Sequence, residues 1–245
     1  MIFFNKNKPF LKDLIPNDFI DIHSHLLPGI DDGAKTIEDT LFLINGLKDI
    51  GFSEFITTPH IFKNVWDNSR TIIEEKHTVT SSELKNNSIT NSFKAAAEYM
   101  MDESFYHLIE KENLLVLKEN YVLVEMSYLY PPLNLYDIIF NLQVAGYNPV
   151  LAHPERYNFY HSNVNEYKKL KKVGCRFQMN ILSSAGYYGP EVAKAADYLL
   201  KNDMIDFVGS DVHHEKHLSF FDKKIILKNI EPFKEAFQNN SFFKS

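Results

Sequence analysis

Two histidines separated by one residue, in Asp21-Ile22-His23-Ser24-His25, are the first residues whose types and spacing suggest chemistry. Apolar residues precede them, so residues 19–22 are predicted to form a short strand that ends at the histidines. Alternate side chains of an extended segment point to the same side, which places the two imidazoles together. Two such imidazoles can bind one metal ion, and a carboxylate from Asp31-Asp32-Gly33 can complete the coordination. Taken alone, the pair is equally consistent with a solvated strand end.

The same arrangement, a metal-binding residue type at the end of a predicted strand, recurs along the chain. Strands are predicted at 52–58, 93–97, 121–124, 148–152, 175–179 and 205–209. All but one lead to a histidine or an acid, and these residues are His60, Glu98, Glu125, His153, and Asp211 with His213. A single glutamate at such a place is most often just the first solvated residue. Recurrence at six of the seven predicted strand ends argues for a metal site instead.

The remaining polar residues divide into site candidates and surface candidates. Asn180 follows the strand at 175–179, and we interpret it as a donor to another site residue or as a substrate contact. The other histidines are predicted to be surface residues, at positions 77, 107, 161, 214 and 217. Cys175 is the only cysteine, so the chain can form no internal disulfide. It is predicted to serve as a small apolar residue of the core.

Helical patterns separate these strands, at 37–50, 70–85, 102–111, 135–145, 163–173, 191–201 and 225–237. The first begins in a capping-box pattern, Thr36 to Asp39, and ends before Gly51. Alternation of strands and helices predicts an α/β fold with a parallel sheet. Seven near-continuous apolar strands favour a closed or distorted barrel over an open sheet. In such barrels, functional residues gather at the carboxyl ends of the strands.

Composition limits the domain organisation and the partners. The chain has 245 residues and a hydrophobic content of 44%, and it shows no linker or repeat. Residues 1–18 are predicted to be an irregular lead-in with Pro9 and Pro16, and residues 19–245 one barrel domain. The net charge of −6 offers no basic footprint for nucleic acid or an anionic membrane. The apolar start, residues 1–4, is too short for a signal peptide, and no run approaches a membrane span. We therefore expect a cytoplasmic protein without membrane insertion.

Nine imidazole and carboxylate ligands exceed what one ion requires, so two or three neighbouring divalent ions are expected to share them. Ligand sets of His, Asp and Glu without thiolate suit Mn²⁺, Fe²⁺ or Zn²⁺, with Co²⁺ as a further candidate. Clustered ions of this kind convert bound water to hydroxide near neutral pH and clamp a phosphoryl group for in-line attack. The predicted chemistry is therefore hydrolysis of a phosphate ester.

The combined motifs resemble the PHP (polymerase and histidinol phosphatase) superfamily. The segments that carry the resemblance span residues 19 to 215, and they are Asp21 to His25, Asp31-Asp32-Gly33, Thr58-Pro59-His60, Glu98, Val124-Glu125, Ala152 to Arg156, and Ser210 to His213. More closely, the chain resembles bacterial PHP-type protein-tyrosine phosphatases of capsule and exopolysaccharide export systems. The resemblance implies a distorted (β/α)₇ barrel and a trinuclear, often manganese-dependent site. It also implies an enzyme that dephosphorylates the tyrosine-rich tail of a cognate bacterial tyrosine kinase.

Carried over residue by residue, the resemblance implies nine metal ligands: His23, His25, Asp32, His60, Glu98, Glu125, His153, Asp211 and His213. Of the two adjacent aspartates, Asp32 is favoured over Asp31. Arg156 matches the phosphate-binding arginine of the family, and together with Asp211 and His213 it is predicted to act in catalysis. The predicted substrate-binding residues are Arg156, Asn180 and Lys216. Some relatives carry a second substrate arginine after the Ser-Asp-x-His motif, whereas residues 212–217 contain none, so Lys216 or His217 would have to replace it.

Three alternatives compete with a metal-dependent phosphotyrosine phosphatase. A small-molecule phosphoesterase, such as a histidinol-phosphate phosphatase, could use the same metals. A PHP module without catalytic activity could serve as a binding domain, but such modules are expected to lose ligands, and here the whole set is present. A cysteine-based phosphatase is excluded, because the position six residues after Cys175 is Ile181 and not an arginine.

Overall fold

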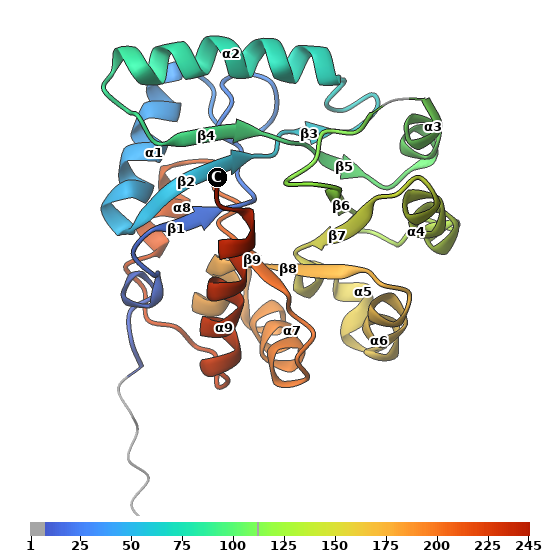
Figure 1. Cartoon of the computed structure of the whole chain (residues 1–245). Helices are drawn as coiled ribbons and strands as arrows, with labels where there is room; N and C mark the ends of the chain where they lie inside the picture. The colour runs from blue at the N-terminus through green and yellow to red at the C-terminus, as the bar shows by residue number, and fades with distance from the viewer. Residues whose placement is uncertain (1–7, 112) are drawn as a thin grey trace, which may run out of the picture.

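The computed structural model describes residues 8–111 and 113–245, which form one mixed α/β domain built on parallel strands (Figure 1). The strands among these residues are β1 (Phe19–Asp21), β2 (Phe52–Thr57), β3 (His60–Ile61), β4 (Ser92–Ala95), β5 (Glu98–Met100), β6 (Tyr121–Glu125), β7 (Asn148–Ala152), β8 (Arg176–Asn180) and β9 (Phe207–Gly209). They form two sheets, one with the order β1-β2-β4 and one with the order β3-β5-β6-β7-β8-β9. Every pair of neighbouring strands is parallel, as predicted.

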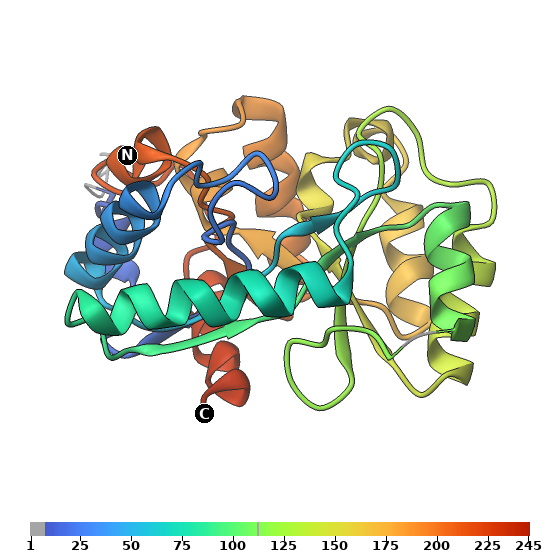
Figure 2. The same ribbon diagram turned by 90° about the horizontal axis from the view of Figure 1, so that it is seen from above.

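Helices cover the outer faces of both sheets. They are α1 (Ile37–Ile50), α2 (Arg70–Asn86), α3 (Glu103–Lys111), α4 (Leu135–Val144), α5 (Asn158–His161), α6 (Asn165–Lys172), α7 (Pro190–Lys201), α8 (Glu215–Phe220) and α9 (Glu231–Asn239). Short 3-10 turns lie at Lys12–Leu14, Pro154–Arg156, Ile181–Ala185 and Asn240–Phe243. In Figure 1, α2 lies above β4, while α3, α4 and α6 follow one another down the right-hand side. In the view from above in Figure 2, several loops extend at the upper edge of the molecule, on the side away from the C-terminus.

Two of the predicted strands, 52–58 and 93–97, are each followed by a short strand that was not predicted and that belongs to the second sheet. Residues 52–58 form β2, and after Pro59 the chain enters the second sheet as β3, which begins at His60. Proline has no N–H to donate to a ladder, which explains the interruption. Pairing nevertheless continues across the break, because Ala96 N donates to Thr57 O at 2.8 Å and Glu98 N to Pro59 O at 3.1 Å. As a result, Glu98 begins β5, whereas the sequence predicted it to follow the end of a strand.

Backbone hydrogen bonds also connect β1 to the segment that follows β9. Asp211 N donates to His23 O at 2.8 Å, and His25 N donates to Val212 O at 3.0 Å. Ser24 and Val212 form a parallel bridge between the two segments. These contacts bring the first histidine motif directly against the Ser-Asp-Val-His motif, although 187 residues separate the two in sequence (His23 O to Ser210 Oγ, 3.3 Å).

Apolar residues fill the space between strands and helices. Val122, Leu123 and Val124 of β6 are fully buried on both faces of the sheet, as expected for a parallel strand covered by helices. The capping box of α1 is confirmed, since Thr36 Oγ1 accepts from Asp39 N and Asp39 Oδ2 accepts from Thr36 N. Gly51 ends this helix at a φ of 121°, which glycine adopts without steric cost.

Several predicted boundaries are wrong. The last helix was predicted from residue 225, but α9 begins at Glu231, because Pro232 is favoured in a first turn and excluded from a helix interior. Helices α5 and α8 were not predicted; both are short, with four and six residues. The predicted lead-in contains the 3-10 turn Lys12–Leu14 and a buried Leu11, and its residues 1–7 lie outside the described residues.

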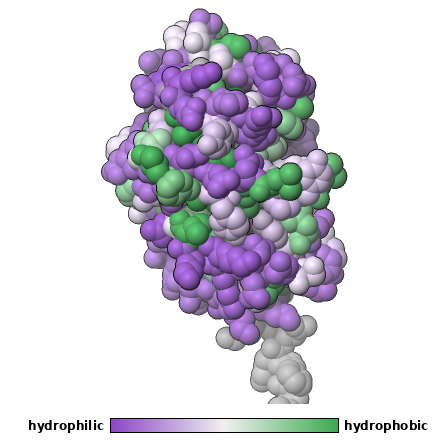
Figure 3. Space-filling view, turned by 90° about the vertical axis from the view of Figure 1, so that its right-hand side faces the viewer, coloured by the Kyte–Doolittle hydropathy of each residue, from purple (hydrophilic) through white to green (hydrophobic). Residues whose placement is uncertain are grey.

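No helix among the described residues has the length and apolar composition needed to cross a bilayer. The surface carries both hydrophilic and hydrophobic residues (Figure 3). Figure 3 shows the face formed by α3, α4 and α6. Hydrophilic residues dominate its upper and lower parts, and hydrophobic residues gather across its middle.

Candidate metal centre

The structure brings all nine predicted ligands together where the parallel strands end. They form four overlapping groups within the described residues, and in each group one ligand atom per residue lies within 4.8 Å of the others. The groups are His25, Asp32, His60 and His213; His23, Glu98 and His153; His23, His25 and Asp211; and His60, Glu98 and Glu125. The overlap of these groups is the geometry expected when neighbouring ions share ligands.

Glu98 lies at the centre of this cluster. Its Oε2 atom is 3.2 Å from His23 Nε2, 3.4 Å from His25 Nε2 and 3.2 Å from His60 Nδ1. Its Oε1 atom is 3.0 Å from His153 Nε2. The side chain is completely buried. A carboxylate whose two oxygens face different imidazoles is placed to bridge two ions.

The hydrogen bonds on the outer side of the cluster show that these residues fit a cation. His23 Nδ1 lies 2.6 Å from Gln178 Oε1, and His25 Nδ1 lies 2.8 Å from Asp31 Oδ2. Both outer oxygens only accept, so each Nδ1 carries a proton, and in its neutral form each imidazole turns the lone pair of Nε2 inward. The two Nε2 atoms are 3.4 Å apart, and Asp211 Oδ1 lies 3.3 and 3.4 Å from them. Lone pairs and carboxylate oxygens that converge in this way are stabilised by a positive ion between them.

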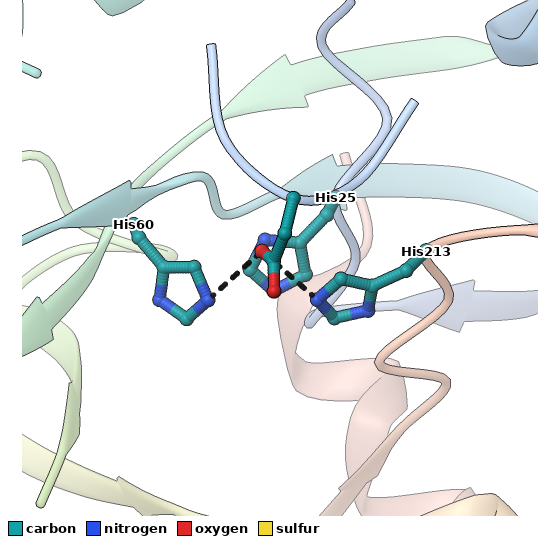
Figure 4. A group of neighbouring side chains, drawn as sticks. His25, His60 and His213 are labelled. Carbon is teal, nitrogen blue, oxygen red and sulfur yellow. Dashed lines mark ion pairs between the residues drawn. The ribbon is translucent and has the colours of Figure 1, made fainter. Parts of the chain in front are cut away.

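A second group lies nearer the surface, around Asp32. Asp32 Oδ1 is 3.5 Å from His60 Nε2 and 3.5 Å from His213 Nε2. Figure 4 shows the carboxylate between these two rings, with the ring of His25 behind it. Asp32 is exposed, whereas His25 is fully buried. The group therefore joins the interior cluster to the open side of the site.

Without a metal ion, the carboxylates of the cluster raise the pKa of neighbouring imidazoles and so favour their protonated form. Burial lowers the pKa of His60, but the carboxylates of Glu125 and Glu98 outweigh this effect and raise the pKa to about 9. The pKa of His25 is raised well above its usual value, despite burial, by Asp31 and other carboxylates. The pKa of Glu98 is held well below its usual range, although burial acts in the opposite direction, by His23 and His60. Any divalent ion that binds here has to displace these protons, so its affinity falls as the pH falls.

Arg156 reaches the same site from the turn that follows β7. Its Nη1 atom donates to Asp211 Oδ2 at 2.9 Å. The guanidinium carbon lies 4.6 Å from the ring centre of Tyr128 and 4.2 Å from that of Tyr188. Arg156 thus pairs with Asp211 and not with its neighbour in sequence, Glu155, and Glu191 pairs with Lys194. Stacking on tyrosine rings holds the guanidinium plane in place while its remaining N–H groups stay available.

These groups line a cavity of about 400 Å³. Proposed ligands and Arg156 form part of its lining, and the rings of Tyr128, Tyr187, Tyr188, His214 and His217 form the rest. The cavity therefore combines charged side chains with aromatic rings.

The two further substrate-binding candidates lie in different places. Asn180 is buried beside the cluster, and its Nδ2 donates to Asp211 Oδ2 at 2.5 Å and to Tyr188 Oη at 3.2 Å. It is thus placed to hold Asp211, which was one of the two interpretations of this residue. Lys216 is exposed on α8, and its ammonium nitrogen is 5.8 Å from the ring centre of Tyr187, outside the lining of the cavity.

His217 differs from its prediction as a surface residue. It is buried and lines the cavity, because α8 turns this side chain inward. Its Nδ1 accepts a hydrogen bond from the backbone N–H of His213. Burial and the positive charges nearby lower the pKa of His217 to about 3. The side chain is therefore neutral and supplies no charge in place of a second arginine.

Two buried residues that hold the ligands were missed from the sequence. Asp31 accepts from His25 and from Gly33 N, and Gln178 accepts from His23. A signal for Gln178 was present, since it lies two residues before Asn180 and shares its side of β8. Asp31 was set aside for Asp32, although an aspartate pair can supply both a ligand and its support.

The conformation of the backbone also shapes the site, and the sequence did not indicate this. His153 and Asp211 both have left-handed backbones, with φ values of 36° and 51°. For residues other than glycine this conformation costs about 1–3 kcal/mol, and it is frequent at functional sites. Gly33 and Gly209 allow close approach, because a Cβ at either would lie 2.4 or 2.6 Å from the Cβ of His25 or His23.

Cys175 lies outside this site, in the apolar core beneath it. It is buried among apolar residues, and burial raises the pKa of its thiol to about 12. We expect Cys175→Ser to leave kcat/KM within about twofold of the unaltered protein, because a protonated buried thiol is no nucleophile. Burial of the new hydroxyl is expected to lower the free energy of unfolding by about 1–3 kcal/mol. Steady-state kinetics and thermal unfolding measure the two effects. A stable variant without activity, or a trapped phosphocysteine, would contradict a metal-based mechanism.

Comparisons with known proteins agree with this geometry. Residues 19–219 match the family described as capsular polysaccharide synthesis, CpsB/CapC. The chain is 29% identical to the tyrosine-protein phosphatase YwqE of Bacillus subtilis (strain 168), over 82% of this chain and 80% of that protein. It is 27% identical to the tyrosine-protein phosphatase CpsB of Streptococcus pneumoniae, over 80% of this chain and 83% of that protein. It is 26% identical to the putative tyrosine-protein phosphatase CapC of Staphylococcus aureus, over 84% of this chain and 81% of that protein.

A solved structure shows the same arrangement of elements. It belongs to a study of YwqE from Bacillus subtilis and CpsB from Streptococcus pneumoniae, described as unique metal-dependent tyrosine phosphatases. The two folds superimpose with a TM-score of 0.77 at 26% sequence identity, over 92% of this chain and 88% of the other. The resemblance drawn from the motifs is thus confirmed, and the chain belongs to the CpsB/CapC family of capsular polysaccharide synthesis.

Proposed function

We propose that this protein is a metal-dependent protein-tyrosine phosphatase. The observation that carries the proposal is the convergence of nine imidazole and carboxylate side chains with Arg156 in one cavity. Two to three divalent ions, Mn²⁺ foremost, would be held by His23, His25, Asp32, His60, Glu98, Glu125, His153, Asp211 and His213. Metal-dependent tyrosine phosphatases of the same family and fold support this assignment.

The same proposal extends to the architecture. Residues 19–245 would form one distorted (β/α)₇ barrel, with residues 1–18 as a lead-in. In its favour, the β2-β4 ladder continues into the β3-β5 ladder through the backbone hydrogen bonds of Ala96 and Glu98. At the other side, the backbone hydrogen bonds of Asp211 and His25 connect the segments that follow β1 and β9, which belong to different sheets. In a barrel, all strand ends face one mouth, which accounts for the meeting of distant motifs.

When bound, the ions supply a nucleophilic water and neutralise phosphoryl oxygens. The residues of the chain then have separate tasks. Gln178 and Asp31 fix the tautomers of two histidines, so that both Nε2 atoms face inward. Arg156 holds phosphoryl oxygens that point away from the ions, because its planar fork can donate two hydrogen bonds at once. Asn180 keeps the carboxylate of Asp211 oriented.

The substrate and pathway follow from the relatives rather than from the cavity alone. We propose a phosphotyrosine-containing protein as partner, in particular the tail of a bacterial tyrosine kinase, with a role in capsule or exopolysaccharide synthesis. The site of action would be the cytoplasm. A histidinol-phosphate phosphatase is not favoured, since the relatives described above are named tyrosine phosphatases.

A substrate comparison tests this function. We expect protein reconstituted with Mn²⁺ to hydrolyse a phosphotyrosine peptide with a kcat/KM at least about tenfold above that for histidinol phosphate, because the cavity is lined in part by aromatic rings that an aryl group can contact. Both rates are measured by phosphate release on the same preparation. Preference for histidinol phosphate would contradict the proposed function and support the small-molecule alternative.

A further inference from the structure

An exposed apolar loop adjoins the cavity, which its residue Tyr128 lines. Residues 127–134, Ser-Tyr-Leu-Tyr-Pro-Pro-Leu-Asn, connect β6 to α4. Leu129 and Leu133 expose 79% and 106% of their surface, and Tyr130 is exposed as well. In Figure 2 this yellow-green loop projects from the edge of the molecule. A soluble domain gains nothing for its own folding from leucines placed in water, so the loop suggests contact with another molecule.

The loop is continuous with the substrate site. Tyr128 belongs to the loop and lines the cavity, where its hydroxyl is 3.4 Å from His153 Nε2 and its ring stacks on Arg156. In the other direction, exposed apolar residues continue along α4 at positions 136, 140 and 144, whose spacing of four places them on one face. Figure 3 shows hydrophobic residues across the middle of the face that α4 occupies. We call the exposed residues Leu129, Tyr130 and Leu133 the apolar rim.

We propose that the apolar rim binds the polypeptide that flanks the phosphotyrosine of a protein substrate, and that it selects apolar, uncharged flanks. This inference rests on the proposed function, because it places the phosphotyrosine itself in the cavity. A chain that leaves the cavity past Tyr128 meets the rim within a few residues. Pro131 and Pro132 restrict the loop, so binding orders it at little further entropic cost.

The lack of charge on the loop favours a neutral peptide over a membrane or a charged peptide as its partner. Residues 127–136 carry no charged side chain, and the sequence contains no Lys or Arg between Lys118 and Arg156. An anionic membrane would be attracted by basic residues, which are missing here. An acidic or basic peptide segment would find no counter-charge on the rim. The surface therefore matches a neutral, apolar protein segment.

Two phosphotyrosine peptides test the proposal. One has leucine two residues to either side of the phosphotyrosine, and the other has serine at both places. We expect the unaltered protein to favour the leucine peptide about tenfold in kcat/KM, through a lower KM, because partial burial of two leucines adds binding that is equal in ground and transition states. In the double variant Leu129→Ser/Leu133→Ser, this ratio is expected to fall to about 1, while kcat/KM for p-nitrophenyl phosphate stays unchanged.

Val79→Ser provides the matched control, since Val79 is an exposed apolar residue on α2 and far from the rim. It should keep the tenfold preference. An unchanged peptide ratio in the double variant, with both peptides still hydrolysed, would overturn the rim as a docking surface and leave the proposed function intact. Rim-dependent binding to phosphatidylcholine vesicles, or rim-dependent dimerisation in light scattering, together with an unchanged ratio would also overturn it. Failure of the unaltered protein to hydrolyse either peptide would overturn the proposed function itself.

Discussion

Replacement of Glu98 with Gln is expected to lower kcat/KM for a phosphotyrosine peptide by about 10³-fold or more. The substitution keeps the shape of the side chain and removes its charge. Glu98 faces four imidazoles through its two oxygens, at distances of 3.0 to 3.4 Å. An amide cannot bridge two cations as a carboxylate does, so the variant is also expected to retain fewer bound ions. Steady-state kinetics and elemental analysis of the purified variant measure both effects.

The matched control is Glu191→Gln, because Glu191 is exposed and pairs only with Lys194 among the described residues. It should change neither rate nor metal content. Circular dichroism separates a loss of ligand from a loss of fold. A folded Glu98→Gln variant with the full metal content and the full rate would contradict the role of Glu98 as the central ligand.

Arg156→Ala is expected to cost about 10²-fold in kcat/KM, by analogy with the loss of one preorganised donor. In-line attack builds charge on phosphoryl oxygens that face away from the ions, and a guanidinium stacked on Tyr128 and Tyr188 is already fixed in the cavity that would hold them. Arg156→Lys should recover only part of the rate, because it restores the charge but not the planar fork. Kinetics of the three proteins on one peptide give the comparison.

Metal content decides how Arg156 acts. Its hydrogen bond to Asp211 allows a second explanation, in which the arginine supports a ligand instead of the phosphoryl group. We expect metal content to remain as in the unaltered protein in both variants. If metal content and rate fall together, Arg156 acts by supporting the metal ligand Asp211. Unaltered kinetics in the alanine variant would exclude any catalytic role for Arg156.

Most of the fold was accessible from the sequence, because each strand and helix repeats a simple pattern of apolar residues. The elements 70–85 and 148–152 were placed within one residue of their observed ends. Features that depend on contacts between distant segments could not be predicted from the sequence. Pro59 redirects β2 into the second sheet, and this can be recognised only once the pairing of β3 with β5 is known. Short helices such as α8 owe their stability to packing and carry too few residues for a periodic signal.

The site was predictable to a similar degree. The meeting of most of the nine proposed ligands at one place was expected, because strand ends in a parallel α/β fold meet at one edge. The full set, including Asp32, was named from the resemblance of the motifs to the family. Their supports depend on contacts between distant segments, such as Gln178 with His23, which no local pattern reveals. The inward turn of His217 and the left-handed backbones of His153 and Asp211 are likewise set by the surrounding structure.

Titration of metal-free protein with Mn²⁺ tests the central claim most directly. Bound metal and turnover of a phosphotyrosine peptide are measured on the same samples, after chelation has removed all divalent ions. The account predicts that the metal-free protein is inactive, and that the rate rises with bound Mn²⁺ to a plateau at two to three ions per chain, because the chain itself offers imidazoles and carboxylates but no activated nucleophile. Full turnover by the metal-free protein would contradict it.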